Sequence, residues 1–570
     1  MAPTDQLQEV KIMLHGTAAS EGIGIGKVML IEEHSLEYTP RTVTDTEAES
    51  QRFKAAVDAF CYNTEKQAEN LRSSAGEKEA EILAGHIQII KDPYLSGEIE
   101  KLIADGQCAE SALEHMCDMF IAMFSAADDE LTKQRAADVR DIKSGVLGIL
   151  LGVNEIKVSD APKGTVLVAR ELTPSVTAGI VKENIAGIIT ETGGTTSHSA
   201  ILARALEIPA VLSVEGVASS LKNGDTVVVD GSEGAVIVNP DDNTVAEYSK
   251  KRDAFLAERK ELENYRGRET KSASGEAYEL FCNIGKPEDA VKAVDADGEG
   301  VGLFRTEFLF MDRTSIPTED EQFEAYKKAA LILKGKSLII RTLDIGGDKD
   351  IPYLGLEKEE NPFMGFRAIR YCLKNRELFK SQIKAILRAS TFGDIKIMFP
   401  LITTMDELRE GKKLVAECKA DLRNMGINFN ENIQVGVMVE TASAAVIADM
   451  LAKEADFFSI GTNDLTGYTM ACDRGNNDVS YLYSPLQPSV LRMIKRTIEC
   501  GVQNGISVGM CGEAAANKLM IPLLISFGLT EFSVSAPSVL NVRKIISTWT
   551  KEEADKVTAK VLEMSTQQEI

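Results

Sequence analysis

The chain has 570 residues, of which 44% are hydrophobic and 26% charged, so it has the composition of a globular protein large enough for several domains. A net charge of −24 argues against nucleic acid as a partner, because phosphate backbones attract clusters of Lys and Arg. Nine widely spaced cysteines, without a C-x-x-C pair, indicate reduced thiols in a cytoplasmic protein. The N-terminus has no secretory signal pattern, and no apolar run approaches the roughly 20 residues that span a bilayer, so we expect no membrane insertion.

Strand-forming segments on both sides of a long helical block mark the first part of the chain. An apolar segment at 26–31 precedes the block, and further segments of strand character follow it at 165–170, 187–190, 226–230 and 235–238. Within 44–151 apolar residues recur at helical spacing, at Glu47–Leu71, Glu77–Ile90 and Tyr94–Ile103. The pattern predicts a small α/β domain of residues 1–42 and 153–243, interrupted by an all-helical domain of residues 43–152. Such a helical block usually supplies a binding face or a lid.

The second part of the chain begins after a charged helix. Residues 244–265 read as one helix about 30 Å long, which predicts a semi-rigid linker of residues 244–266. After Gly267 short apolar strands alternate with helices, and this alternation predicts a (β/α)₈ barrel of residues 267–570. The eight expected strands are Tyr278–Ile284, Gly300–Phe304, Ser337–Leu343, Ile395–Pro400, Ile433–Val439, Phe457–Gly461, Ser507–Cys511 and Glu531–Ser535. The predicted fold class is therefore α/β multidomain.

His198 lies in a run of glycines and hydroxyl residues that opens an amphipathic helix. Gly193 and Gly194 would let backbone amides approach an anion closely, and the helix through Ile201 and Leu206 would point its positive end at the same place. This arrangement suits a histidine that carries a phosphoryl group. A turn whose histidine only caps or packs is the alternative that the run alone leaves open.

Polar residues collect where the predicted barrel strands end, which is where barrel active sites lie. Arg305 and Arg341 could form a bidentate clamp on phosphate or carboxylate, to which Arg474 could add a third fork. Glu440 and Asp464 offer the hard oxygen ligands of a Mg²⁺ site. The other residues at these strand ends are Asn283, Glu307, Asp344, Pro400, Asn463, Cys511, Glu513 and Ser533.

Cys511 is ambiguous on sequence alone. A thiol at a strand end beside Glu513 could donate or take a proton, whereas a cysteine in a buried strand is more often inert packing. Two centres therefore emerge. One is a histidine that could accept phosphate, and the other is a barrel that could hold a small phosphorylated carboxylate with Mg²⁺.

Several long motifs resemble one family over nearly the whole chain. The run Gly193–Arg204 is similar to the phosphohistidine signature of phosphoenolpyruvate-utilising enzymes. Five barrel segments resemble motifs of Enzyme I, the phosphoenolpyruvate-protein phosphotransferase family of the bacterial sugar phosphotransferase system: Gly302–Arg313, Arg341–Lys349, Glu360–Arg370, Gly436–Thr441 and Phe458–Leu465.

The resemblance implies a reaction and its partners. It implies that phosphoenolpyruvate phosphorylates His198, that pyruvate is released, and that His198 then passes the phosphoryl group to the carrier protein HPr as the first step of sugar uptake. It further implies that the small α/β domain swivels, that the helical domain docks HPr and that the barrel forms a homodimer. The implied barrel roles are phosphate binding by Arg305, Arg341 and Arg474 with Asn463 assisting, Mg²⁺ binding by Glu440 and Asp464, and proton donation to the enolate by Cys511.

One residue departs from the family pattern, and two other functions compete. Enzyme I sequences usually have arginine where this chain has Thr195, which puts the efficiency of transfer in doubt. Pyruvate phosphate dikinase or phosphoenolpyruvate synthase would share the histidine and the barrel, but these enzymes need a large nucleotide-binding domain. A regulatory paralogue that binds HPr without turnover is the second rival, and the density of barrel-end groups argues against it.

Overall fold

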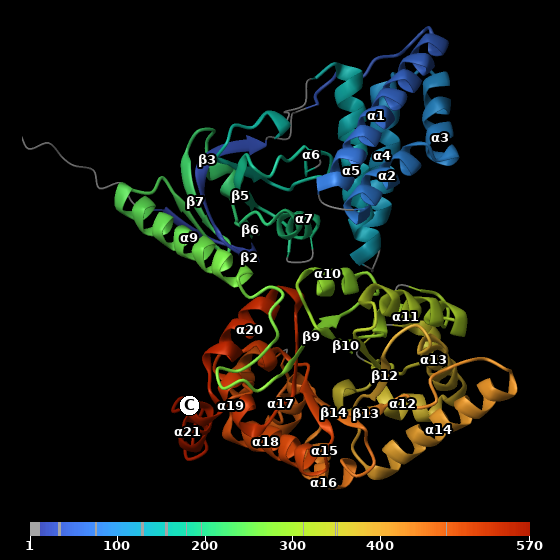
Figure 1. Cartoon of the computed structure of the whole chain (residues 1–570). Helices are drawn as coiled ribbons and strands as arrows, with labels where there is room; N and C mark the ends of the chain where they lie inside the picture. Colours follow the sequence, from blue (N-terminus) through green and yellow to red (C-terminus); the bar gives the residue numbers. More distant parts are fainter. Residues whose placement is uncertain are drawn as a thin grey trace, which may run out of the picture. The chain divides into compact units, whose positions relative to one another are not determined.

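The computed structural model describes residues 12–31, 36–74, 77–126, 130–153, 158–177, 179–194, 197–311, 313–347, 349, 351–474 and 476–570. The chain divides into two compact units, one up to Arg259 and one from Lys260 onward (Figure 1). In the described part of the chain, no helix combines the length and the apolar character needed to cross a membrane. The finer domain boundaries given above remain predictions.

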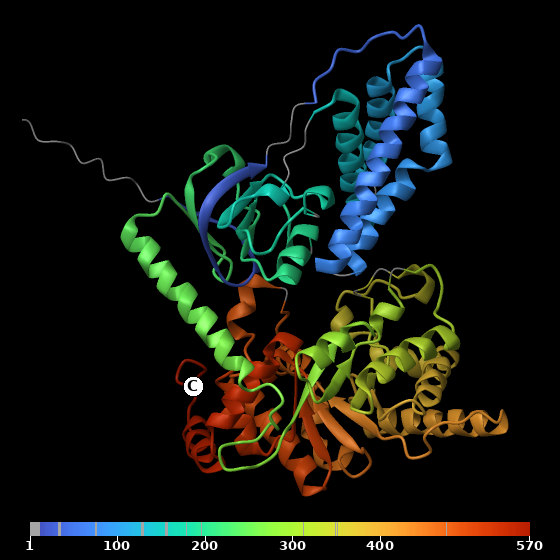
Figure 2. The same ribbon diagram turned by 45° about the horizontal axis from the view of Figure 1, so that its top comes forward.

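The predicted helical block is a bundle in the first unit. Figures 1 and 2 show its helices, coloured blue to teal, running beside one another. Residues such as Phe53, Ile99 and Leu113 form its buried core. Pro93 occupies the first position of one helix, and the Asp92 side chain accepts hydrogen bonds from two backbone amides there, which fixes the helix start. The helices are α1 (Thr46–Ser74), α2 (Glu77–Ile90), α3 (Pro93–Ala104), α4 (Ala109–Ser125) and α5 (Glu130–Leu151).

A mixed sheet forms the α/β part of the first unit. Lys27–Ile31 pairs in parallel with Thr165–Ala169, so the strand before the helical block lies beside the strand after it, as the interrupted domain requires. Three short strands, β1, β2 and β6, were not predicted, because segments of three or four residues give little periodicity. The sheet order is β1 (Ile12–His15), β8 (Ala235–Val238), β7 (Thr226–Asp230), β3 (Ile23–Ile31), β4 (Thr165–Ala169), β5 (Ile185–Thr190), β6 (Ala210–Leu212) and β2 (Thr17–Ser20).

The helices of this α/β part are short, apart from the charged helix at its end. Helices α6 (Pro174–Thr177), α7 (His198–Leu206) and α8 (Val217–Ser220) connect the strands. The charged helix is α9 (Asp242–Glu263), close to the predicted bounds. Tyr248 of α9 is buried against the sheet, whereas most of the other α9 side chains are polar and exposed.

The second unit confirms the predicted barrel. Its eight strands are parallel and follow one another around the barrel in sequence order. β9 pairs with β10 on one side and with β16 on the other, which closes the barrel. All eight predicted strands are present: β9 (Glu279–Ile284), β10 (Gly300–Phe304), β11 (Ser337–Arg341), β12 (Ile395–Phe399), β13 (Val435–Val439), β14 (Phe457–Ile460), β15 (Ser507–Met510) and β16 (Glu531–Val534).

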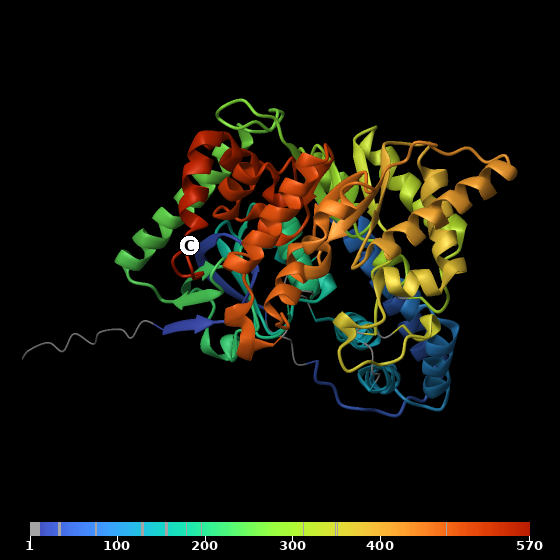
Figure 3. The same ribbon diagram turned by 90° about the horizontal axis from the view of Figure 1, so that it is seen from below.

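Helices cover the outside of the barrel (Figure 3). They are α10 (Asp289–Asp295), α11 (Glu319–Leu333), α12 (Ala368–Lys374), α13 (Arg376–Ala389), α14 (Met405–Asn424), α15 (Ala442–Val446), α16 (Ala448–Leu451), α17 (Thr462–Met470), α18 (Pro488–Gln503), α19 (Met520–Phe527), α20 (Val539–Thr548) and α21 (Lys551–Val561). Side chains of alternate strand residues fill the interior and form a buried cluster, so the barrel is a packed core whose carboxyl end carries the site. The cluster consists of Leu303, Ile339, Met398, Met438, Phe457 and Cys511.

Candidate active site

His198 is the first residue of helix α7, as the sequence predicted. Ser197 caps the helix, and its side chain accepts a hydrogen bond from the Ala200 backbone amide at 3.3 Å. Gly193, with φ of 105°, adopts a backbone conformation that favours glycine, and its carbonyl accepts a hydrogen bond from the Ser213 hydroxyl at 2.6 Å. Thr195, the departure from the family pattern, lies outside the described residues.

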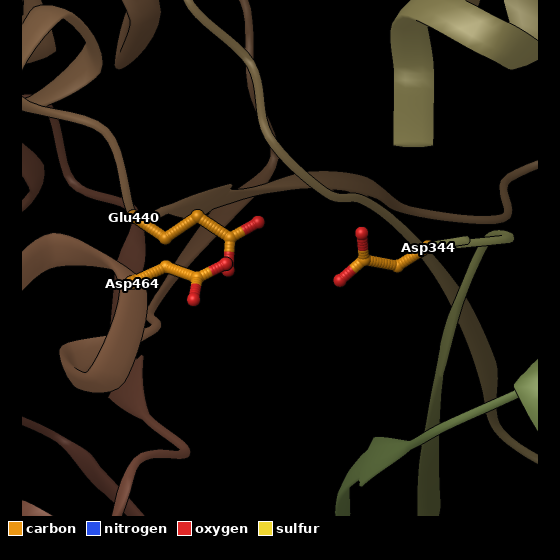
Figure 4. A group of neighbouring side chains, drawn as sticks. All are labelled: Asp344, Glu440 and Asp464. Atoms are coloured by element: carbon orange, nitrogen blue, oxygen red, sulfur yellow. The ribbon is translucent and has the colours of Figure 1, made fainter. Parts of the chain in front are cut away.

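Three carboxylates meet at the carboxyl end of the barrel. Asp344 follows β11, Glu440 follows β13, and Asp464 lies in the first turn of α17 after β14. One oxygen from each lies within 4.8 Å of the others, and Figure 4 shows Asp344 facing the other two. The sequence predicted the Glu440 and Asp464 pair, and the structure adds Asp344. Three hard oxygen donors so close together form a donor set that suits a divalent cation such as Mg²⁺.

Arg341 and Arg367 hold these carboxylates in place. The Asp344 carboxylate receives Arg341 Nη1 at 2.9 Å and Arg367 Nη2 at 2.7 Å, and Arg367 Nη2 also reaches Asp464 Oδ2 at 3.2 Å. Arg341 Nη2 pairs with Glu307 at 2.7 Å. Burial alone would raise the pKa of Asp344, but the two guanidinium groups lower it, so this carboxylate stays charged.

Glu440 behaves differently from Asp344. It is 2% exposed, and burial together with the charges of Asp464 and Asp344 raises the pKa of Glu440 to about 8. Its Oε1 accepts a hydrogen bond from the Leu401 backbone amide at 2.6 Å, which fixes the side chain. Because this pKa lies close to neutral pH, removing the proton so that the carboxylate can bind a cation costs little free energy.

Cys511 lies directly after β15 and is 3% exposed. Its Sγ lies 3.7 Å from the Ile460 carbonyl oxygen, which accepts the weak S–H hydrogen bond. Burial raises the pKa of the Cys511 thiol to about 11, while the Ser459 hydroxyl opposes part of this rise. The thiol is therefore protonated at neutral pH and can act as an acid.

The remaining predicted residues lie around this cluster. Arg305 follows β10 and is exposed, and its charge acts on Asp344 and Cys511. Asn463 precedes Asp464, and its carbonyl accepts a hydrogen bond from the Tyr483 hydroxyl at 3.0 Å. Arg474 is exposed in the segment after α17, and its charge lowers the pKa of Tyr483 against the rise caused by burial. The predicted barrel residues thus gather at one end of the barrel.

Arg367 is the residue that sequence reasoning missed. It is 7% exposed and comes from the excursion between β11 and α12, so no strand end pointed to it. Its guanidinium lies 5.8 Å from the Phe363 ring centre and 3.4 Å from the Tyr468 hydroxyl. The signal in the sequence is the motif Glu360–Arg370, which contains Arg367, although the motif alone assigns no role to this arginine.

Comparison with known proteins identifies the family. Three family models match in order: the N-terminal domain of phosphoenolpyruvate-utilising enzymes at residues 15–135, their mobile domain at 161–234 and their phosphoenolpyruvate-binding domain at 259–550. A phosphoenolpyruvate-protein phosphotransferase of Bacillus subtilis is 47% identical over 99% of this chain and 98% of its own length. The chain belongs to the phosphoenolpyruvate-protein phosphotransferase family of enzymes.

Further relatives of the same name support this membership. The phosphotransferases of Listeria innocua and Staphylococcus carnosus are 45% and 44% identical over 98% of this chain, and cover 98% and 97% of their own lengths. Among solved structures, the NMR structure of Enzyme I (nEIt) is 37% identical over 43% of this chain and 99% of its own, with a TM-score of 0.39.

Proposed function

We propose that this enzyme transfers the phosphoryl group of phosphoenolpyruvate to its own His198 and then to a histidine of the carrier protein HPr, with release of pyruvate. The observation that carries the proposal is the joint presence of two centres in one chain of this family. One is a histidine at a helix N-terminus behind a glycine loop, and the other is a barrel end with three carboxylates, arginines and a protonated thiol.

The barrel residues suit each part of the substrate. Arg305, Arg341 and Arg474 would bind the phosphate, because the guanidinium fork matches phosphate oxygens and stays charged. The Asn463 amide would assist them. Removing the phosphoryl group from phosphoenolpyruvate leaves negative charge on the enolate oxygen, and preorganised positive groups stabilise that charge.

The carboxylates Glu440 and Asp464 would hold Mg²⁺, with Asp344 as a third oxygen donor. When bound, the ion neutralises charge on the phosphoryl group and the enolate. Arg367 would have to shift when the ion binds, because its Nη2 now pairs with two of the proposed ligands, Asp344 and Asp464. Cys511 would donate the S–H proton to the methylene carbon of the enolate, which completes pyruvate.

His198 and the barrel belong to different units, so the proposed reaction requires one arrangement of the units for phosphorylation and another for transfer to the carrier. Helix α9 would join the two parts through both steps. A cross-link that fixes the first unit to the barrel unit and leaves phosphorylation of HPr intact would contradict this requirement.

An exposed apolar surface on the helical bundle suits the docking of HPr. Tyr94 of α3 and Met119 and Met123 of α4 are 60%, 45% and 54% exposed. The rings of Tyr94 and Phe120 pack at 6.3 Å, and those of Phe120 and Phe124 at 5.9 Å. A contiguous apolar surface of this kind is typical of a protein interaction site. We further propose a cytoplasmic protein that forms a homodimer through the barrel, which sedimentation of the barrel unit would test.

The deciding experiment uses labelled phosphoenolpyruvate and Mg²⁺. We expect an acid-labile, base-stable phosphate that disappears in His198→Ala and persists in His115→Ala, a control at an exposed histidine of α4. Labelling from ATP instead of phosphoenolpyruvate would support the dikinase or synthase function. Absence of any label in the unaltered protein would overturn the enzymatic proposal.

A further inference from the structure

Gln382 of helix α13 is a polar residue that the proposed function leaves without a role. Its side chain is fully buried, and its neighbours on the buried face of the helix are apolar residues such as Phe379, Ile383 and Ile386. Burying an amide costs free energy unless its N–H and C=O groups find hydrogen-bond partners. These groups of Gln382 all have partners, and the partners include both strand ends that carry the arginines proposed to bind phosphate.

The Gln382 amide connects the segment after β10 with the segment after β11. Its Oε1 accepts a hydrogen bond from the Leu343 backbone amide, after β11, at 2.9 Å. Its Nε2 donates to Thr306 Oγ1, after β10, at 3.2 Å and to the Tyr326 hydroxyl of α11 at 3.2 Å. Since a backbone amide only donates, the side-chain oxygen must face Leu343, and this fixes the orientation of the amide. One side chain therefore ties two strand ends together.

Thr306 extends this connection to the backbone of Arg341. The Thr306 hydroxyl oxygen accepts the bond from Gln382, and its O–H donates to the Arg341 carbonyl at 3.0 Å. The ladder between β10 and β11 ends at the pair Phe304 and Ile340, so this side-chain bond joins the two strands just beyond their last backbone pair. Thr306 is fully buried, so water does not compete for either of its bonds.

The two connected segments carry Arg305 and Arg341. Arg305 directly precedes Thr306, while the backbone around Arg341 is held at its carbonyl by Thr306 and two residues later by Gln382. Glu307, which directly follows Thr306, pairs with Arg341 Nη2 at 2.7 Å, so an ion pair spans the same two segments. Two guanidinium forks bind one phosphate group only when their spacing matches its oxygens. The position of one arginine is thus coupled to that of the other.

We propose that Gln382 is a positioning residue that sets the spacing of Arg305 and Arg341 and thereby the affinity of the site for the phosphate of the substrate. Gln382 takes no part in the reaction itself and acts only through the two segments. Without its amide, the Leu343 N–H and the Thr306 hydroxyl would each lose a buried partner, and the two segments would no longer be tied through α13. The inference rests on the proposed role of the two arginines.

The test compares Gln382→Met with Gln322→Met in pyruvate release from phosphoenolpyruvate with HPr in excess. Methionine keeps the length of glutamine but loses the amide. Gln322 of α11 is the matched control, because it is equally buried and its amide bonds to the Pro317 carbonyl and the Tyr326 hydroxyl, away from both strand ends. In Gln382→Met we expect KM for phosphoenolpyruvate and the inhibition constant of inorganic phosphate to rise roughly tenfold, with a smaller change in kcat. Both constants should stay unchanged in Gln322→Met.

Two variants of Thr306 test the same connection if Gln382→Met does not fold. Thr306→Val removes the hydroxyl and should raise both constants, whereas Thr306→Ser keeps the hydroxyl and should have nearly the constants of the unaltered enzyme. The inference is overturned if both constants are unchanged in Thr306→Val or in folded Gln382→Met, or if they rise equally in Gln322→Met. Failure of the unaltered enzyme to form the His198 phosphate would instead overturn the proposed function.

Discussion

Replacing Arg543 by methionine should strongly destabilise the barrel unit. Arg543 of α20 is 2% exposed and the largest fully buried side chain in the described part of the chain. Its guanidinium donates to Thr270 Oγ1 at 3.0 Å, to the Tyr265 carbonyl at 3.1 Å and to the Asp297 carbonyl at 2.8 Å. It also pairs with the carboxylates of Asp297 and Glu299. This one side chain therefore ties the segment after α9 to the barrel.

The size of the loss in unfolding free energy follows from the groups that would lose their partner in Arg543→Met. Two carboxylates, which are 28% and 31% exposed, would lose their shared buried cation, and two backbone carbonyls would lose a donor. Removing one partner of a buried ion pair costs about 3–5 kcal/mol, whereas an exposed pair is worth about 0–1 kcal/mol. We expect Arg543→Met to lower the free energy of unfolding of the barrel by an amount in the first range.

The single tryptophan of the chain, Trp549, makes this loss measurable. It directly follows α20 and packs against the barrel core, so its fluorescence reports the unfolding of this unit in urea. Arg496→Met is the matched control, because Arg496 is exposed and pairs with Asp449 at 2.8 Å. A loss in Arg543→Met no larger than that in Arg496→Met would refute the reasoning.

Three further predictions concern the loop, the barrel interior and the docking surface. Gly193→Ala should slow formation of the phosphohistidine several-fold, because φ is 105° and the new Cβ would lie 3.1 Å from the N-cap hydroxyl. Gly194→Ala, where a Cβ meets open space, should label at the unaltered rate, and equal slowing in both would contradict the argument. The raised pKa of Glu531 predicts stability that is fully present below pH 4.5 and is lost as pH rises toward 8, on the order of 5 kcal/mol in all. Urea titrations should show this dependence flattened in Glu531→Gln, and an unchanged slope would count against a protonated carboxyl. Tyr94→Ala should raise the HPr concentration needed for half-maximal transfer roughly tenfold, with self-phosphorylation intact. Leu256→Ala, at another exposed apolar side chain, should leave both steps unchanged.

The barrel strands were predictable because a parallel strand buried on both faces reads as a short apolar run. Gly300–Phe304 and Val435–Val439 are such runs, with polar or charged residues at their borders. The strand ends then gave Glu440 and Asp464, because parallel strands bring their carboxyl ends to one edge of a barrel. Local sequence was sufficient to place both residues at this edge, since Glu440 directly follows β13 and Asp464 lies in the first turn of the helix that follows β14.

Arg367 and Glu531 show where this reasoning stops. Arg367 reaches Asp344 from a long excursion, whose course depends on tertiary contacts that no local period encodes. Glu531 reads from the sequence as the polar start of a strand, and such a residue ordinarily faces solvent. Only the closed barrel brings Gly302 and Gly509 against its carboxyl group, from strands far apart in the chain. Nothing in the sequence around the two glycines indicates why a side chain is absent there. The reason is visible only in the fold, where a Cβ at either position would collide with the Glu531 carboxyl oxygen.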